Sequence, residues 1–206
     1  YRYIYDTYGN TVGILDPKGR LTVFKYDEQN QQTHRYLPFE VNPVQINDAA
    51  SVYTALNTAN PLPLCEYTYY DALNRISLSL DYKGQATGYF YNSQGRLEYK
   101  RYYKADQTAA DGWNDNYPDT PVEEYYYTYD SLGRQKRIYC NQNLQQEYEY
   151  DVEGRVIRIT SPQGIINYAY SPVTGRKVMT WTGETWETRD NEFEYFYNDL
   201  GQLSSV

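Results

Sequence analysis

Apolar and polar side chains alternate along this chain in short stretches with a period of two residues. Tyr148 and Tyr150 fall on one side of the alternation, and Glu147 and Glu149 fall on the other. Successive side chains of a β-strand point to opposite faces, so this alternation is typical of strands. The same spacing recurs at Tyr3/Tyr5, Tyr89/Tyr91, Tyr125/Tyr127/Tyr129, Tyr168/Tyr170 and Tyr195/Tyr197. The pattern predicts many short strands, each with tyrosine along one face.

A turn signal of the form Tyr-(Asp/Asn/Ser)-x-x-Gly separates these stretches. Its eight copies occupy residues 5–9, 26–30, 70–74, 91–95, 129–133, 150–154, 170–175 and 197–201, the seventh being one residue longer. The Asp, Asn or Ser side chain accepts hydrogen bonds from the following backbone. Counted from this Asp, Asn or Ser, Gly is at the fourth position, where it suits a positive φ, as in a type I turn followed by a bulge. Asn30 and Asn74 replace this Gly, and Asn is the other residue that tolerates the left-handed conformation.

The turns are regularly spaced. Asp6 to Asp27, Asp71 to Asn92 and Asp130 to Asp151 are each 21 residues apart. A second turn of the same predicted type follows ten residues later at 16–19, 81–84 and 161–164, and residues 141–143 fill this place less clearly. Each unit therefore reads as an antiparallel β-hairpin. We predict an all-β fold of tandem hairpins with a period of 21, in a single array of about eight units over residues 1–206.

About sixteen strands in one array would not form a flat sheet, because strands twist. We therefore expect a curved or spiralling sheet. Its two end strands would leave unpaired edges, which favours further repeats beyond this chain and makes it a fragment of a larger array. The strands after the turns begin with arginine followed by an aliphatic residue, as at Arg20, Arg75, Arg96 and Arg155. Such an arginine is expected to lie over a tyrosine ring or to meet a carboxylate.

Two insertions interrupt the period, at about residues 33–66 and 104–123. In the first, Ala49, Val52, Ala55, Leu56 and Ala59 have near-helical spacing, and Asn47 or Asp48 is placed to cap a short helix. The insertions could line the curved sheet or contact a partner, but we favour Phe39, Trp113 and Tyr117 as anchors of these loops onto the sheet. Asp106, Asp111, Asp115 and Asp119 lack the compact spacing of a calcium loop.

Composition and charge narrow the function. Of the 206 residues 28 are tyrosine, so a conventional core of Leu, Ile and Val is not expected. The net charge is −8 without a basic stripe, which argues against nucleic-acid binding. No apolar run approaches the ~20 residues needed to span a bilayer. Cys65 and Cys140 are expected to be free thiols, although a disulfide between them stays open.

The sequence offers little catalytic chemistry. Glu147 and Glu149 would lie on one strand face at a separation of about 6.6 Å by strand geometry, which overlaps the range for inverting glycosidases. Alternating Glu and Tyr is also the ordinary pattern of a half-solvated strand, which we prefer. The single histidine, His34, leaves no nucleophile–base pair and too few ligands for zinc. We therefore predict no enzyme activity, no catalytic, cofactor or metal site, and no cofactor.

Aromatic surfaces also bind glycans and quaternary ammonium groups, and hairpin arrays are known among choline- and glucan-binding modules. Trp113, Trp181 and Trp186 do not follow the repeat period, however. Packing of tyrosines between strands is thus preferred to a dedicated glycan site.

Residues 91–97, 127–134 and 148–156 resemble the YD-repeat family, also called Rhs repeats, whose motif is approximately Tyr-x-Tyr-Asp-x-x-Gly-Arg-Leu. Matching segments extend from Tyr3 to Leu203, outside the two insertions. The resemblance implies a spiralling β-sheet that builds a hollow shell, similar to those of bacterial toxin complexes, polymorphic Rhs toxins and animal teneurins.

The implied function is therefore structural: a shell segment that encloses or displays another polypeptide. Its partners would be neighbouring YD repeats or an enclosed C-terminal polypeptide, in a secreted or cell-surface protein. The alternative is an extracellular module that binds a glycan or a cell-surface protein through exposed tyrosines and loops. The family's self-cleavage motif, Asp-Pro-x-Gly-Leu, is not matched, since Asp16-Pro17 is followed by Lys18-Gly19-Arg20 and reads as an ordinary turn.

Overall fold

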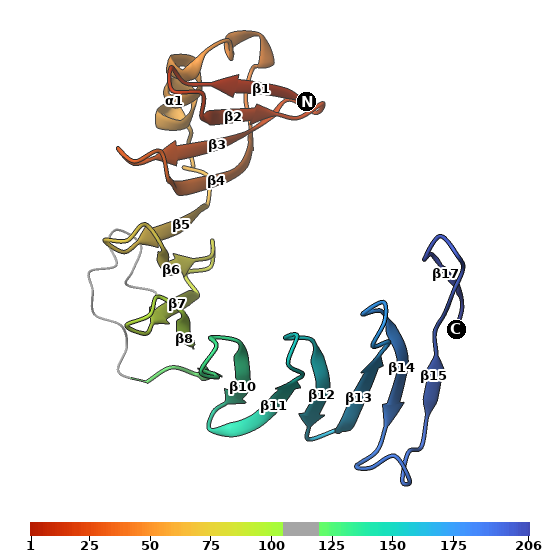
Figure 1. Ribbon diagram of the computed structural model, residues 1–206. Coiled ribbons are helices and arrows are strands. Elements are labelled where there is room, and N and C mark those ends of the chain that lie inside the picture. Colours follow the sequence, from red (N-terminus) through yellow and green to blue (C-terminus); the bar gives the residue numbers. More distant parts are fainter. Residues whose placement is uncertain (105–119) are drawn as a thin grey trace. The chain divides into compact units, whose positions relative to one another are not determined.

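The computed structural model describes residues 1–104 and 120–206, which form two compact units (Figure 1). The first unit comprises Tyr1–Phe90 and Lys100–Val122, and the second comprises Tyr91–Tyr99 and Glu123–Val206. Most of the second predicted insertion, with Trp113, Tyr117 and the four aspartates considered for calcium, lies outside the described residues. The two units are treated separately below.

The first unit is a run of antiparallel strands in chain order with one helix. Its elements are β1 (Arg2–Tyr5), β2 (Thr11–Leu15), β3 (Arg20–Tyr26), β4 (Gln32–Glu40), the 3-10 turn η1 (Pro43–Gln45), α1 (Ala49–Thr58), β5 (Cys65–Tyr70), β6 (Ile76–Leu80) and β7 (Ala86–Tyr91). Each strand from β1 to β6 pairs antiparallel with the next. The strand β8 (Leu97–Tyr103) has residues in both units.

The second unit repeats the same arrangement. Its strands are β9 (Glu123–Tyr129), β10 (Gln135–Cys140), β11 (Asn143–Tyr150), β12 (Val156–Ser161), β13 (Gly164–Tyr170), β14 (Lys177–Thr182) and β15 (Glu192–Glu194). They pair antiparallel in chain order, and β16 (Phe196–Tyr197) and β17 (Leu203–Ser205) form a separate two-stranded hairpin. The predicted all-β fold of tandem antiparallel hairpins is confirmed.

The Tyr-Asp turns have the predicted geometry, as the turn at Asp130 shows. Gly133 N–H donates to the Asp130 carbonyl at 3.0 Å, and Gly133 has a φ of 84°. The Asp130 carboxylate accepts the backbone N–H of Leu132 at 3.0 Å and that of Arg134 at 2.9 Å. Asn30 and Asn74 replace Gly with φ values of 60° and 62°, which confirms their expected left-handed conformation.

The midway turns are more varied than predicted. Those at Asp16 and Asp81 share the Tyr-Asp geometry, with Gly19 and Gly84 N–H donating to the aspartate carbonyls. Ser161 instead pairs directly with Gly164, so the prediction of the same turn type there is wrong. Cys140 likewise pairs with Asn143, leaving a two-residue loop whose residues both have positive φ, as in a type I′ turn. The strands β12 and β13 keep a regular register up to their two-residue loop, whereas the register of β10 and β11 shifts between Ile138 and Tyr139.

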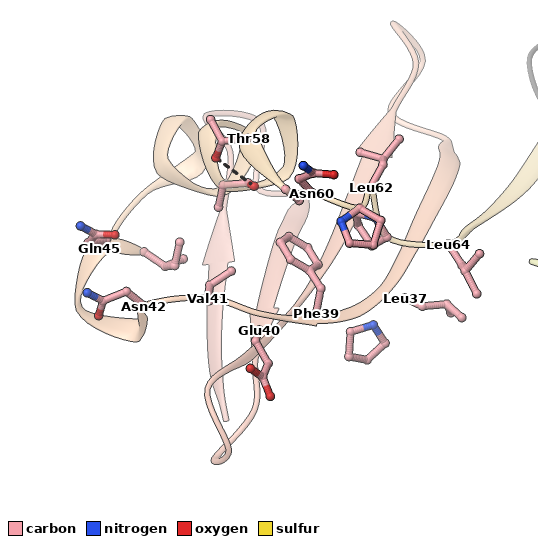
Figure 2. A pocket seen from close by; sticks show the side chains of 16 residues that line it. Leu37, Phe39, Glu40, Val41, Asn42, Gln45, Thr58, Asn60, Leu62 and Leu64 are labelled. Carbon is pink, nitrogen blue, oxygen red and sulfur yellow. Dashed lines mark hydrogen bonds between the residues drawn. The ribbon is translucent and has the colours of Figure 1, made fainter.

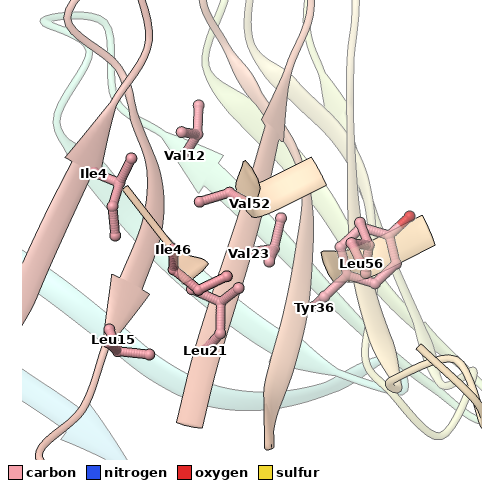
Figure 3. Close-up of a cluster of buried hydrophobic side chains, with 9 residues drawn as sticks. All are labelled: Ile4, Val12, Leu15, Leu21, Val23, Tyr36, Ile46, Val52 and Leu56. Carbon is pink, nitrogen blue, oxygen red and sulfur yellow. The ribbon is translucent and has the colours of Figure 1, made fainter. Parts of the chain in front are cut away.

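The helix α1 forms where the spacing of apolar residues predicts it. Asp48 is the N-cap: its side chain accepts from Ser51 N–H at 2.8 Å, and Ser51 Oγ accepts the Asp48 N–H at 3.0 Å. This reciprocal pair is a capping box. The helix contacts β1, β2 and β3 and buries Val52 and Leu56 against them (Figure 3). Gly13 allows the approach, because a Cβ there would lie 2.8 Å from Val52 Cγ2.

The core of the first unit is aliphatic, contrary to the expectation from composition. Beneath α1, nine buried side chains form one cluster, and their identities are Ile4, Val12, Leu15, Leu21, Val23, Tyr36, Ile46, Val52 and Leu56 (Figure 3). Phe39 packs against this cluster, which confirms its predicted anchoring role. The segment expected to be an insertion thus begins as the strand β4 and contributes a helix to the core.

Candidate functional site

The residues considered for catalysis are engaged in packing or ion pairs. Glu147 pairs with Arg137 across the sheet at 2.6 Å, and Glu149 lies 3.9 Å from Arg158. Each of these contacts joins side chains on one face of β10, β11 and β12, as expected for a half-solvated strand surface. The two glutamates therefore face arginines of neighbouring strands.

His34 lies in β4 among aromatic rings. Its ring stacks on Tyr36 with centroids 6.0 Å apart and meets the edge of Tyr67 at 4.9 Å. Burial, and secondarily the charge of Lys25, lowers the pKa of His34, so the neutral ring predominates near neutral pH. Within residues 1–104 and 120–206, no cluster of three or more His, Cys, Asp or Glu side chains is arranged to hold a metal ion.

Both cysteines are free thiols, as expected. Burial raises the pKa of Cys65, so its thiol stays protonated and poorly nucleophilic. The Asp16-Pro17 segment is an ordinary turn: Asp16 accepts the N–H groups of Lys18 and Arg20, each at 2.9 Å, and pairs with the Arg20 side chain.

The repeated feature of the fold is a contact between consecutive hairpins, which we call the tyrosine ladder. At six of the Tyr-Asp turns, the tyrosine immediately before the turn donates its hydroxyl to a backbone carbonyl of the preceding hairpin. The pairs are Tyr26–Thr11 (2.9 Å), Tyr70–Gln32 (3.0 Å), Tyr129–Leu97 (2.7 Å), Tyr150–Gln135 (2.6 Å), Tyr170–Val156 (2.8 Å) and Tyr197–Lys177 (2.8 Å). Positions in a turn are counted from the Asp, Asn or Ser that follows the tyrosine. In each of these pairs the acceptor is the residue after the fifth position of the preceding turn, or after the equivalent residue of the longer turn at 170–175.

Arginine at that fifth position completes the ladder in the second unit. Its guanidinium lies over the ring of the next ladder tyrosine, in the pairs Arg96–Tyr129 (5.1 Å), Arg134–Tyr150 (4.4 Å), Arg155–Tyr170 (4.7 Å) and Arg176–Tyr197 (5.4 Å). Several of these arginines also bind the first aspartate of their own turn, as Arg134 binds Asp130 and Arg155 binds Asp151. Both predicted partners of arginine, ring and carboxylate, are confirmed.

The ladder bridges a gap in the sheet. Pairing between β10 and β11 begins at Arg137 and Glu147, short of the turn end of both strands. The Tyr150 phenol spans this gap to the Gln135 carbonyl, and the Arg134 guanidinium covers the ring. Burial raises the pKa of Tyr150, so the phenol remains a hydrogen-bond donor well above neutral pH. The contact therefore fixes one hairpin to the next where backbone hydrogen bonds do not.

Tyrosine also packs on the opposite face of the second unit. Tyr126 stacks on Tyr99 with centroids 4.8 Å apart and on Tyr139 at 5.9 Å. Near β14 and β15, Trp181 meets the edge of Trp186 at 5.5 Å, and Arg189 covers the Trp186 ring. These aromatic side chains thus pack mainly against side chains of neighbouring strands and loops.

A groove in the first unit is formed by the segments flanking α1 (Figure 2). It measures about 860 Å³ and is lined mainly by apolar side chains, among them Leu37, Phe39, Val41, Leu62 and Leu64. The residues come from the end of β4, from the C-terminal part of α1 and from the chain on either side of the helix.

Removing a single ladder hydroxyl is expected to destabilise the second unit. Tyr150→Phe leaves the Gln135 carbonyl without its 2.6 Å partner, and the loss of such a hydrogen bond costs about 1 kcal/mol. The free energy of unfolding, measured with urea, should fall by that amount. Tyr3→Phe is the control. Because Tyr3 is 52% exposed, this change should leave the free energy of unfolding unchanged. Equal midpoints for the two variants would contradict a stabilising role for the ladder.

Acid should weaken the turns. A hydrogen bond from the Arg75 side chain, followed by one from its backbone N–H, lowers the pKa of Asp71 below 3.8. The Arg20 backbone N–H does the same for Asp16. Since the folded pKa lies below the unfolded one, this stabilisation is present above about pH 4 and is lost as the pH falls through the folded values. Urea midpoints should drop below pH 4, and less steeply in Asp71→Asn; identical pH profiles would contradict this assignment.

The comparisons with known proteins show the fold. No family model matches the sequence, and no curated protein matches it. A chain in the crystal structure of TcdB2-TccC3-Cdc42 superposes with a TM-score of 0.65 at 18% identity, over 98% of this chain and 10% of that chain. The chain thus has a fold found in a toxin-complex protein and spans about a tenth of that protein's length.

Two further matches are weaker. The crystal structure of TcdB2-TccC3 gives a TM-score of 0.35 at 16% identity, over 98% of this chain and 15% of that chain. The Photorhabdus luminescens Tc holotoxin pore gives 0.35 at 15% identity, with the same coverage. Neither superposition is close enough to add to the argument.

Sequence reasoning identified the turns and the arginine contacts but missed the ladder acceptors. The phenol of each ladder tyrosine binds a carbonyl about one hairpin away, and a carbonyl carries no signal of residue type. The available signal was position: each acceptor follows the fifth residue of a turn or its equivalent.

No helix among the described residues is both long and apolar enough to cross a membrane.

Proposed function

We propose that this chain is a non-enzymatic segment of a β-shell of the YD/Rhs type, which encloses or displays another polypeptide. The observation that carries the proposal is the tyrosine ladder, because the same contact joins one hairpin to the next in both units. A contact that repeats from hairpin to hairpin can extend a wall by adding units, as in other repeat proteins. The fold shared with a TcdB2-TccC3 chain supports the same conclusion.

The use of tyrosine supports a wall over a dedicated glycan-binding module. The ladder tyrosines direct their hydroxyls to backbone carbonyls, and in the second unit a guanidinium covers the ring. These groups are therefore occupied within the protein. By resemblance, the partners would be further YD repeats or an enclosed C-terminal polypeptide, in a secreted or cell-surface protein.

Limited proteolysis of the full-length gene product, followed by mass spectrometry, tests the proposal. A C-terminal segment that is severed yet retained and protected from protease is the expected result for a toxin-type container. Rapid digestion of every segment outside the repeats would contradict enclosure and would favour an open adhesion surface. Glycan and partner screening would then be the next measurement.

A further inference from the structure

Two junctions of the tyrosine ladder, both in the first unit, have an uncharged residue in place of the arginine: Asn10 before Tyr26, and Gln31 before Tyr70. In the second unit, arginine fills the fifth position and covers the next ladder tyrosine, as Arg134 covers Tyr150 at 4.4 Å. The turn that begins at Asp27 has Gln31 at the fifth position. The following ladder tyrosine, Tyr70, is in place and donates to the Gln32 carbonyl at 3.0 Å. The junction between β4 and β5 thus keeps the tyrosine but not the arginine.

A cavity of about 490 Å³ lies at this junction, and we call it the Gln31 notch. Its lining includes Asp27, Gln31, Thr33, Tyr70 and Asn74. Pairing between β4 and β5 begins at His34 and Tyr67, so the strands diverge toward the two turns. The same divergence occurs between β10 and β11, where Arg134 occupies the corresponding position. The volume falls within the range of small-ligand sites.

Two aspartates line the notch: Asp71 is paired with Arg75 at 2.7 Å, whereas Asp27 is left without a cation among the described residues. Asp27 Oδ1 accepts the N–H groups of Gln29 at 3.0 Å and Gln31 at 2.8 Å. In the parts of the chain that the structure describes, Asp27 forms no ion pair, whereas Asp130 binds Arg134 at 2.7 Å. The Gln31 side chain turns away and donates to the Asn74 carbonyl at 3.2 Å.

The first turn shows how an uncharged residue can close this position. Asn10 Nδ2 bonds both to Asp6 Oδ2 at 3.0 Å and to Asn30 Oδ1 at 2.9 Å. The Asn10 amide therefore donates one hydrogen bond to the carboxylate of its own turn and another to the side chain of the next turn. Gln31 makes only the second kind of contact, which leaves the Asp27 carboxylate and the Tyr70 ring available together.

We propose that the Gln31 notch binds the guanidinium group of an arginine side chain from another polypeptide. The bound group would pair with the Asp27 carboxylate and lie over the Tyr70 ring, in the arrangement that Arg134 adopts with Asp130 and Tyr150. A planar guanidinium donates from several N–H groups while its face stacks on an aromatic ring, which a lysine ammonium cannot do. This site goes beyond the proposed shell role and does not depend on it.

The test uses the full chain labelled with ¹⁵N and the probe peptide acetyl-Gly-Arg-Gly-amide. The expected result is saturable shifts of the Gln31 side-chain amide and of backbone amides near Asp27 and Asn74. The matched peptide with citrulline keeps the shape of arginine without its charge and should bind at least tenfold more weakly. Equal shifts with citrulline, equal affinity for the lysine peptide, or shifts located elsewhere would each overturn the proposal.

Two variants sharpen the test. Asp27→Asn removes the charge but keeps the turn, because Asn92 makes the same two backbone contacts in its own turn. It should weaken arginine-peptide binding at least tenfold. Gln31→Arg supplies the missing side chain from within and should abolish binding. Unchanged affinity in either folded variant would overturn the proposal.

The reciprocal change makes a second prediction from the same argument. Arg134→Gln empties the corresponding position beside Asp130 and Tyr150, so the folded variant should bind a second equivalent of the arginine peptide near Asp130. A folded Arg134→Gln that still binds one equivalent would contradict the view that a missing arginine creates the site. If this variant does not fold, the Asp27 and Gln31 variants decide the question.

Discussion

Replacing Leu56 by alanine is expected to lower the free energy of unfolding of the first unit by about 2–5 kcal/mol. Leu56 is 2% exposed and belongs to the aliphatic cluster between α1 and the sheet. A Leu→Ala change in such a core removes buried methyl groups and leaves a cavity that the surroundings fill only partly. The effect should appear as a lower urea midpoint and as an earlier loss of the helical circular dichroism signal.

Val44→Ala provides the control for Leu56→Ala. Val44 lies in η1, in the same insertion, but is 79% exposed. Its truncation should change the free energy of unfolding by no more than about 0.5 kcal/mol. Equal effects of the two variants would mean that the helix does not stabilise the sheet, and the insertion would then be a peripheral loop.

Gly133→Val should strongly destabilise the second unit. Gly133 has a φ of 84°, and a β-branched residue in this conformation is strained by about 1–3 kcal/mol. The added Cβ would also lie 2.9 Å from Arg96 Nη1, which covers the Tyr129 ring. The variant therefore strains its own turn and displaces the arginine of the preceding hairpin. Urea denaturation of the purified variant measures the sum of both effects.

Two other substitutions separate these effects. Gly154→Val has the same φ of 84°, but its Cβ would lie 3.7 Å from Arg134 Nη1, an ordinary contact. It should therefore lose at least ~1 kcal/mol from backbone strain, but less than Gly133→Val. Gly133→Asn should lose least in the backbone, since Asn30 and Asn74 occupy equivalent positions. Unchanged midpoints in both valine variants would contradict the turn geometry.

The sequence predicted features whose causes are local. A type I turn with a bulge depends on five adjacent residues, so Asp130 and Gly133 were sufficient to predict it. The helix was predictable because Val52 and Leu56 are four residues apart and Asp48 precedes them. The turn at Ser161 was mispredicted because Pro at the second position and Gly at the fourth suit several turns. There the register of the flanking strands decided between them.

The missed features depend on contacts between segments or on averages that conceal them. The abundance of tyrosine over the whole chain hid a local concentration of aliphatic residues, since Val12, Leu15, Leu21 and Val23 all lie in two adjacent strands. The Gln31 notch likewise depends on the spatial relation of two consecutive turns. The sequence shows Gln in place of Arg, but not the space that this leaves beside Tyr70.

Strand order that follows chain order has a consequence for how such a protein is made. In the second unit the strands β9 to β15 pair in chain order, and the ladder bonds from Tyr150 onward join residues 14 to 20 positions apart. Native contacts of this kind close short loops, and chains rich in them fold fast. A hairpin could therefore be added to the preceding one while later residues are still being synthesised. Unravelling from one end could equally proceed one hairpin at a time, so partial unfolding need not disturb the rest of the unit.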